Sequence, residues 1–130
     1  MKKITDRTLD KLVRSYLLGL KDYCCERCHQ SFPPDELEVS HLYRRARKVL
    51  RWDLRNVHLL CKSNPATGRM GCHEEIDSDH IKLVSFEYEV LSKEDIIDLQ
   101  RLSTMTLKEH PIDRELIKQD LKEKIGILEP

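Results

Sequence analysis

Four of the five cysteines are spaced in a way that favours one shared metal site. Two form a C-x-x-C pair, and two more follow downstream with ten residues between them; they are Cys25, Cys28, Cys61 and Cys72. Tetrahedral zinc takes four thiolates at about 2.3 Å, and a C-x-x-C turn presents two of them to one ion. The ten-residue loop contains one proline and two glycines, so it could fold outward and return Cys72 beside Cys61. We therefore predict a structural zinc site.

Two features of the composition support zinc over the alternative that these cysteines are buried thiols with no metal. Aromatic residues make up 5% of the chain and charged residues 35%, so apolar side chains are scarce for 130 residues. Metal binding would then supply part of the folding free energy. Disulfides are disfavoured, because an odd number of cysteines cannot pair completely. Cys24 is expected to be a core thiol, with an exchange between Cys24 and Cys25 as ligand left open.

The amino terminus is polar and charged, and the chain has no apolar run long enough for a signal peptide or a membrane span. We expect a soluble, cytoplasmic protein with no membrane partner. Cytosolic thiols stay reduced, which agrees with metal ligation.

Hydrophobic periodicity predicts an α+β fold in a single domain, 1–130. An amphipathic helix is expected from about residue 9 to residue 20, capped by Thr5 or Asp6. Alternating apolar residues predict three strands, and helical spacing or capping residues predict three further helices. The strands are 37–41, 56–61 and 81–90; the helices run through 73–77, from Ser92 onward, and from Pro111 to a stop at Gly126.

A basic segment lies in the middle of the chain, although the formal net charge is zero, with 23 basic and 23 acidic residues. Six positive side chains in a dozen positions are opposed only by Asp53; they are Arg44, Arg45, Arg47, Lys48, Arg51 and Arg55. Such like charges repel unless a polyanion neutralises them, so we expect DNA bound mainly through its phosphates.

The motifs CERC, SHLYRR, RWDLRN, LLC and GCH, in this order between Tyr23 and Ile76, resemble those of HNH endonucleases. They are most similar to the NinG/Rap-like recombination endonucleases of phages. The resemblance implies a small zinc-stapled ββα-metal core over 23–80. An N-terminal helix, 1–22, would precede it, and a C-terminal strand and helical extension, 81–130, would follow.

The same resemblance implies that His41 is the general base, that Asn56 orients the hairpin or the base, and that His73 ligates a catalytic Mg²⁺ or Mn²⁺. The chemistry is compatible, because imidazole titrates near neutral pH and a cation neutralises charge on the phosphate. Many HNH sites have an aspartate directly before the first histidine, where this chain has Ser40. Glu38, Glu74 or Glu75 could assist the metal instead.

His58 and Trp52 also lie in this region. His58 could support the site or simply be packed in the core. Trp52 is expected to anchor the core.

The expected function is a metal-dependent DNA endonuclease acting on branched or recombination-intermediate DNA, in the host cytoplasm if the chain is phage-encoded. One alternative is a non-catalytic zinc-ribbon module that binds DNA. Another is a protein-interaction adaptor that uses residues 92–125, a region that could also form a homodimer.

Overall fold

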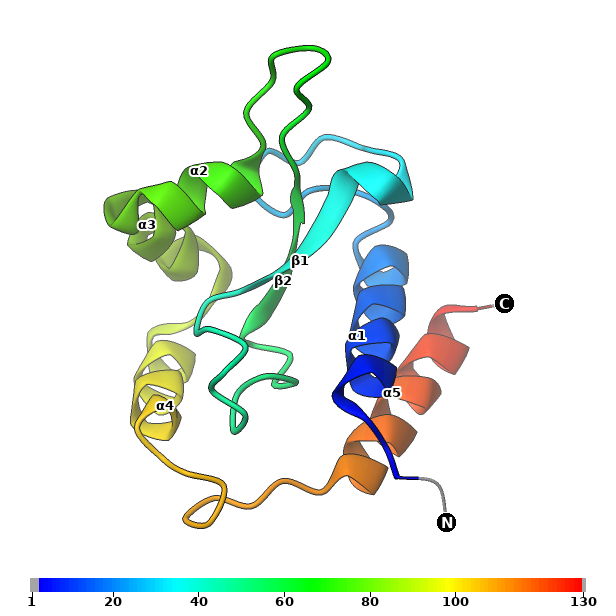
Figure 1. Ribbon diagram of the computed structural model, residues 1–130, viewed down its shortest axis with the longest axis vertical. Helices are drawn as coiled ribbons and strands as arrows, with labels where there is room; N and C mark the ends of the chain where they lie inside the picture. The colour runs from blue at the N-terminus through cyan, green and yellow to red at the C-terminus, as the bar shows by residue number, and fades with distance from the viewer. Residues whose placement is uncertain (1–2, 130) are drawn as a thin grey trace.

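The computed structural model describes residues 3–129, which form five α-helices, one 3₁₀ turn and one two-stranded antiparallel sheet. In chain order these are α1 (Asp6–Leu20), η1 (Pro34–Glu36), β1 (Leu37–His41), β2 (Val57–Cys61), α2 (Cys72–Ser78), α3 (His80–Val90), α4 (Lys93–Ser103) and α5 (Arg114–Leu128). The α+β class is confirmed. Figure 1 shows the sheet at the centre, with α1 and α5 side by side on one flank and α2 and α3 on the other.

Helix α1 forms as its sequence pattern predicts. The Thr5 hydroxyl accepts a hydrogen bond from the Thr8 amide and caps the helix. Leu9, Val13 and Leu17 recur at four-residue steps and are all buried. This stripe faces the sheet, and α5 packs beside it.

The two strands confirm the predicted pieces and form a hairpin with a long connection. Leu37 pairs with Cys61 and His41 pairs with Val57. All five residues of β2 are buried, because α1 and α2 both contact this strand. The hairpin therefore places His41 at one end of the sheet and Cys61 at the other.

The predicted strand at 81–90 is wrong, because this segment is the helix α3. The Asp79 carboxylate accepts hydrogen bonds from the Ile81 and Lys82 amides and starts the helix. Phe86 is buried, whereas Tyr88 is 61% exposed. The alternating apolar residues of this segment do not share one buried face, as a strand would require.

The two C-terminal helices agree with the sequence in part. Ser92 caps α4 as predicted, accepting a hydrogen bond from the Asp95 amide. Helix α5 begins at Arg114, not at Pro111, because the Asp113 side chain caps it. The predicted stop at Gly126 is also wrong: this glycine does not adopt the positive φ that ends many helices, and α5 continues to Leu128.

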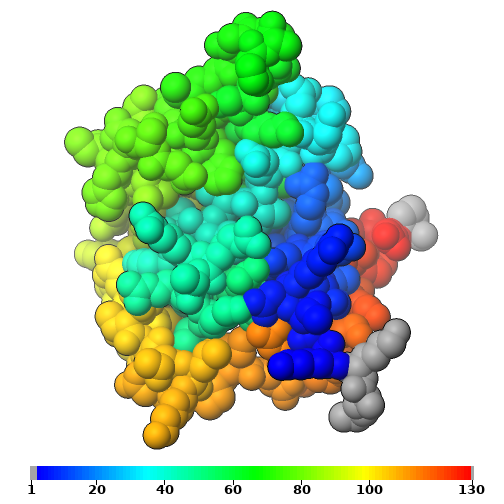
Figure 2. Space-filling model, viewed as in Figure 1, coloured from blue at the N-terminus to red at the C-terminus, as the bar shows by residue number. Residues whose placement is uncertain are grey.

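Two clusters of buried side chains hold these elements together. The larger joins α1, the sheet, α2, α3 and α5, and the smaller joins α4 to the loop between the strands through Leu50, Leu99 and Leu102. That loop, residues 42–56, covers one face between α1 and α4 (Figure 2). Within residues 3–129, no helix is both long and apolar enough to cross a membrane.

Candidate functional site

The structure brings four cysteines together at one end of the sheet. The sulfur atoms of Cys25, Cys28, Cys61 and Cys72 all lie within 4.8 Å of one another. Cys28 Sγ and Cys61 Sγ are 3.9 Å apart, close to the edge of about 3.8 Å expected for a ZnS₄ tetrahedron. Cys25, Cys61 and Cys72 are buried. These donors and their spacing fit one zinc ion, so the predicted cluster is confirmed as a possible metal site.

Three separate segments supply these sulfurs. Cys25 and Cys28 lie in the turn after α1, where the His29 amide donates to the Cys25 carbonyl at 2.9 Å. Cys61 ends β2, and Cys72 begins α2. Cys24 does not join the cluster, since its thiol points to the Asp22 carbonyl at 3.4 Å.

The loop between Cys61 and Cys72 folds outward and returns, as predicted. Asn64 and Arg69 form an antiparallel bridge, and Gly68 between them has a φ of 71°, which favours glycine. Gly71 packs so closely that a β-carbon there would lie 2.2 Å from the carbonyl carbon of Lys62. The loop projects from the molecule beside α2 (Figure 1).

Cys61 Sγ accepts two hydrogen bonds, from the Cys72 amide and the Arg69 guanidinium, whereas Cys25 Sγ accepts one, from the Arg27 amide. Burial alone would raise the pKa of Cys61, but donors from the Cys72 amide and the Arg69 guanidinium outweigh burial and lower it. Burial and the neighbouring sulfurs raise the pKa of Cys72. Cys61 is therefore the thiolate that the protein itself stabilises most directly.

His41 and His73 line one cleft of about 960 Å³. His41 ends β1, and His73 is the second residue of α2. The cleft is also lined by charged and polar side chains, among them Glu38, Arg44, Arg45, Asp77 and His80. The structure therefore places two of the three predicted catalytic residues at one cavity.

The environment of His41 defines its tautomer. Its Nε2 lies 3.1 Å from the Arg51 carbonyl oxygen, which can only accept a hydrogen bond. Nε2 therefore carries the proton, and Nδ1 keeps a free lone pair. Burial lowers the pKa of His41, and the positive charge of Arg45 adds to this effect.

His73 lies between two carboxylates. Its Nδ1 is 3.3 Å from Glu38 Oε1, and its Nε2 is 3.3 Å from Asp77 Oδ2. These oxygens approach different ring nitrogens, and among residues 3–129 only the four cysteines converge as a ligand group within 4.8 Å. Glu74 and Glu75 are engaged elsewhere, by Ser63 and by Arg27 and Lys82.

Asn56, the third predicted catalytic residue, lies outside the cleft and is fully buried. Its Oδ1 accepts from the Tyr43 amide at 2.7 Å, and its Nδ2 donates to the Tyr43 and Leu50 carbonyls. Leu50 directly precedes Arg51, whose carbonyl holds His41. Asn56 therefore fastens the backbone that orients His41.

Ser40 of β1 and His58 of β2 are paired in the sheet, and both are buried. Ser40 Oγ has no hydrogen-bond partner, and Ser40 does not line the cleft. His58 is 2.9 Å from the Arg55 carbonyl and 3.1 Å from Glu26, and it meets the Phe86 ring edge-on. His58 is therefore a packed core residue with satisfied nitrogens.

The premise that the basic segment lacks acidic partners is wrong. Carboxylates from α1 and α4 reach it: Asp10 pairs with Arg45 and Arg51, Asp6 with Lys48 and Arg51, and Asp95 and Asp98 with Arg55. Arg47 donates to the Ser103 carbonyl. The tertiary fold brings these acids in from distant positions, so repulsion within the segment does not by itself require a polyanion. Of the six basic residues, Arg44 and Arg45 line the cleft.

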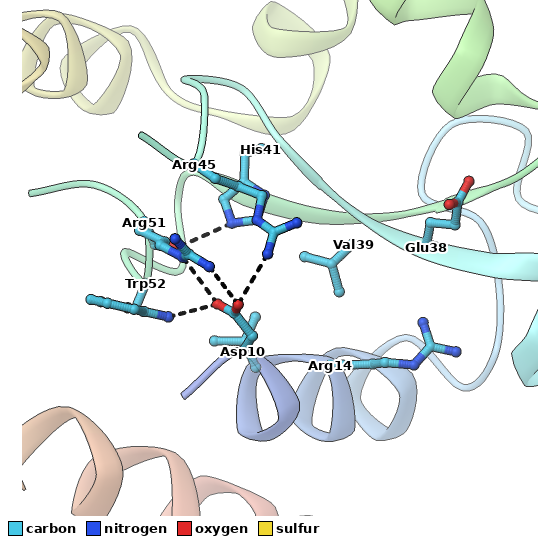
Figure 3. Close-up of a pocket in the computed structure, with 9 residues that line it drawn as sticks. Asp10, Arg14, Glu38, Val39, His41, Arg45, Arg51 and Trp52 are labelled. Carbon is cyan, nitrogen blue, oxygen red and sulfur yellow. Dashed lines mark hydrogen bonds and ion pairs between the residues drawn. The ribbon is translucent and has the colours of Figure 1, made fainter. Parts of the chain in front are cut away.

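Figure 3 shows how Asp10 organises the loop beside His41. Its carboxylate accepts from Arg51 at 2.7 Å and from the Trp52 indole at 2.9 Å. Burial opposes ionisation of Asp10, but these hydrogen bonds lower its pKa. Trp52 is 5% exposed and so belongs to the core, as expected.

Asp77 and Asp10 were not anticipated as part of this region. Asp77 stands four residues after His73, which on a helix places both side chains on one face, and this spacing was a usable signal. Asp10 gave no such signal, because its partners lie about forty residues away. Comparison of the chain with family models, with curated proteins and with solved structures finds no match.

Proposed function

We propose that this protein is a metal-dependent DNA endonuclease of the HNH type, with β1, β2 and α2 as its ββα-metal core. The observation that carries the proposal is that His41 and His73, far apart in the sequence, line one cleft with Glu38 and Asp77. The ordered resemblance of the motifs between Tyr23 and Ile76 supports the same assignment.

His41 is the general base in this proposal. Its Nδ1 has the free lone pair, and its lowered pKa keeps the ring neutral near pH 7, so it can take a proton from an attacking water. Asn56 acts by position: it holds the loop whose Arg51 carbonyl orients the ring.

A divalent cation, Mg²⁺ or Mn²⁺, would bind to His73 together with Glu38 or Asp77, leaving positions for water and a phosphate oxygen. Such an ion neutralises charge on the phosphate and on the leaving oxygen. Arg44 and Arg45, at the same cleft, would contact DNA phosphates without reading bases. The four cysteines would hold a structural zinc ion.

Cleavage of supercoiled plasmid and of a branched duplex, with and without Mg²⁺ or Mn²⁺, tests the proposal. We expect His41→Ala to lower the initial rate by about 10²- to 10⁴-fold, the usual contribution of a general base. The matched control is His110→Ala, an exposed histidine distant in sequence from the cleft residues, which should cleave like the wild type. Equal cleavage rates for His41→Ala and the wild type would rule out His41 as the general base.

The second candidate is a non-catalytic zinc-ribbon module that binds DNA. It is favoured by the serine that stands directly before His41 in the sequence, where many HNH sites have an aspartate, and by the buried position of this Ser40, which does not line the cleft. Salt-sensitive DNA binding with no cleavage in either metal would support this candidate.

A further inference from the structure

We propose that Arg69 is a positioning residue for the cysteine cluster, which holds the Cys61 sulfur in place and lowers the free energy of the metal-bound state. This inference rests on the proposed zinc site. Arg69 lies in the loop between Cys61 and Cys72, and its Nη1 is 3.4 Å from Cys61 Sγ. Its Nη2 donates to the Lys62 carbonyl at 3.1 Å, so the two arms of the guanidinium hold two consecutive residues.

The guanidinium is also held from outside the loop. Its central carbon lies 4.5 Å from the centre of the Phe32 ring, within the range of a cation–π contact. Phe32 belongs to the segment that follows Cys28, so Arg69 connects the two halves of the cysteine cluster. Arginine can make these three contacts together because its guanidinium is planar and presents several donors in a fixed fork.

Charge gives a second reason for this role. A zinc ion with four thiolates carries a net charge of about −2, and three of the four cysteines are buried. The other guanidinium beside the cluster, that of Arg27, is paired with Glu75 at 3.1 Å. The nearest carboxylate of Arg69 is Glu36, at 3.9 Å. A carboxylate therefore neutralises the charge of Arg69 less than that of Arg27, and Arg69 interacts more strongly with the negative sulfur.

Arg69 also closes the loop between Cys61 and Cys72 through its backbone. The amides of Asn64 and Arg69 donate to each other's carbonyls, at 2.9 and 3.1 Å. The Cys72 amide donates to Cys61 Sγ at 3.4 Å, where the Arg69 side chain also donates. Both ends of the projecting loop therefore meet at the Cys61 sulfur, and Arg69 supplies the side-chain contact.

Zinc affinity of the full chain, measured by competition with a chromophoric chelator under reducing conditions, tests the inference. We expect Arg69→Gln to bind zinc about 10- to 100-fold more weakly, as is usual when a partner of a metal ligand is lost. Arg69→Lys, which keeps the charge but not the fork, should lie between Arg69→Gln and the wild type. Arg101→Gln, at an exposed arginine of α4 paired with Asp98, is the control and should match the wild type.

Cobalt substitution supplies a readout that a loss of stability alone would not change. The thiolate-to-cobalt charge-transfer band should shift in Arg69→Gln at saturating cobalt, because one sulfur has lost its charged donor. Zinc affinity of Arg69→Gln within twofold of the wild type, with an unshifted band, would overturn the inference. If Arg69→Gln does not fold, the zinc affinity of Arg69→Lys decides, and a value within twofold of the wild type would overturn the inference. A wild-type chain that binds no zinc would refute the zinc site itself.

Discussion

The role of Asn56 follows from its buried position and its backbone hydrogen bonds. The family resemblance implies that Asn56 orients the hairpin or the base, and the structure buries this residue completely, with each polar atom of its amide hydrogen-bonded to the backbone. A buried amide that bonds backbone carbonyls cannot also contact substrate. Its contribution to the proposed activity is therefore the geometry of the 42–56 loop.

Asp6 carries a prediction at the residue scale. Hydrogen bonds from Lys48 and then Arg114 lower the pKa of Asp6 to about 2. Because the folded-state pKa lies below the unfolded value, the stabilisation is present above about pH 4 and is lost as pH falls toward 2. We expect Asp6→Asn to lower the free energy of unfolding at pH 7 by about 1 kcal/mol, a value reduced for solvent screening.

Urea unfolding at several pH values checks this expectation. Acid also protonates thiolates, so the quantity to compare is the difference between the variant and the wild type, which should shrink below pH 4. Asp35→Asn, at an exposed position of η1, is the control. A difference that does not change with pH would mean that the Asp6 charge is not the source.

At the scale of elements, α3 is where a local pattern and the fold disagree. Val84, Phe86, Tyr88 and Val90 alternate in sequence, which is typical of a half-buried strand. The same segment has buried or half-buried residues at Leu83, Phe86 and Val90, a spacing that suits a helix packed on the core. Capping by Asp79 and packing beside α2 favour the helix.

Alanine substitutions in α3 distinguish the two conformations. In a strand Phe86 and Tyr88 would share one face, whereas in α3 one is buried and the other is exposed. We expect Phe86→Ala to lower the free energy of unfolding by about 3–5 kcal/mol and Tyr88→Ala by about 0.5 kcal/mol or less. Urea denaturation of both variants measures this, and similar losses for the two would contradict the helix.

At the scale of the whole molecule, the cysteine cluster connects three segments that are distant in sequence. It joins the turn after α1, the end of β2 and the start of α2. A metal ion at this point would couple the folding of all three segments, so its binding free energy would be part of the folding free energy.

Neighbouring cysteines allow a matched test of this coupling. We expect Cys25→Ser to lose the bound zinc and to unfold at a markedly lower temperature, because Cys25 lies in the cluster. Cys24→Ser should keep one zinc per chain, because the Cys24 thiol points away from it. Metal analysis together with thermal unfolding checks both variants, and equal zinc content would contradict the assignment of Cys25.

Local patterns were sufficient for the features that depend on neighbours in the chain. The stripe of Leu9, Val13 and Leu17 and the caps at Thr5 and Ser92 predicted α1 and the start of α4, because helix formation and capping act over three or four residues. The cysteine spacing predicted the cluster, because a C-x-x-C turn presents two thiolates to one ion and the loop with its proline and glycines can return Cys72 beside Cys61.

Tertiary structure decided what depends on residues distant in sequence. The pairing of the basic segment with Asp6 and Asp10, the burial of Asn56, and the position of Glu38 beside His73 arise only when α1 and α2 pack on the sheet. Charge compensation and burial are properties of proximity in space, and a linear pattern does not contain them. The sequence by itself therefore determined α1, the start of α4, the two strands of the sheet and the cysteine cluster. The fold determined the conformation of α3 and which charges and imidazoles share a cleft.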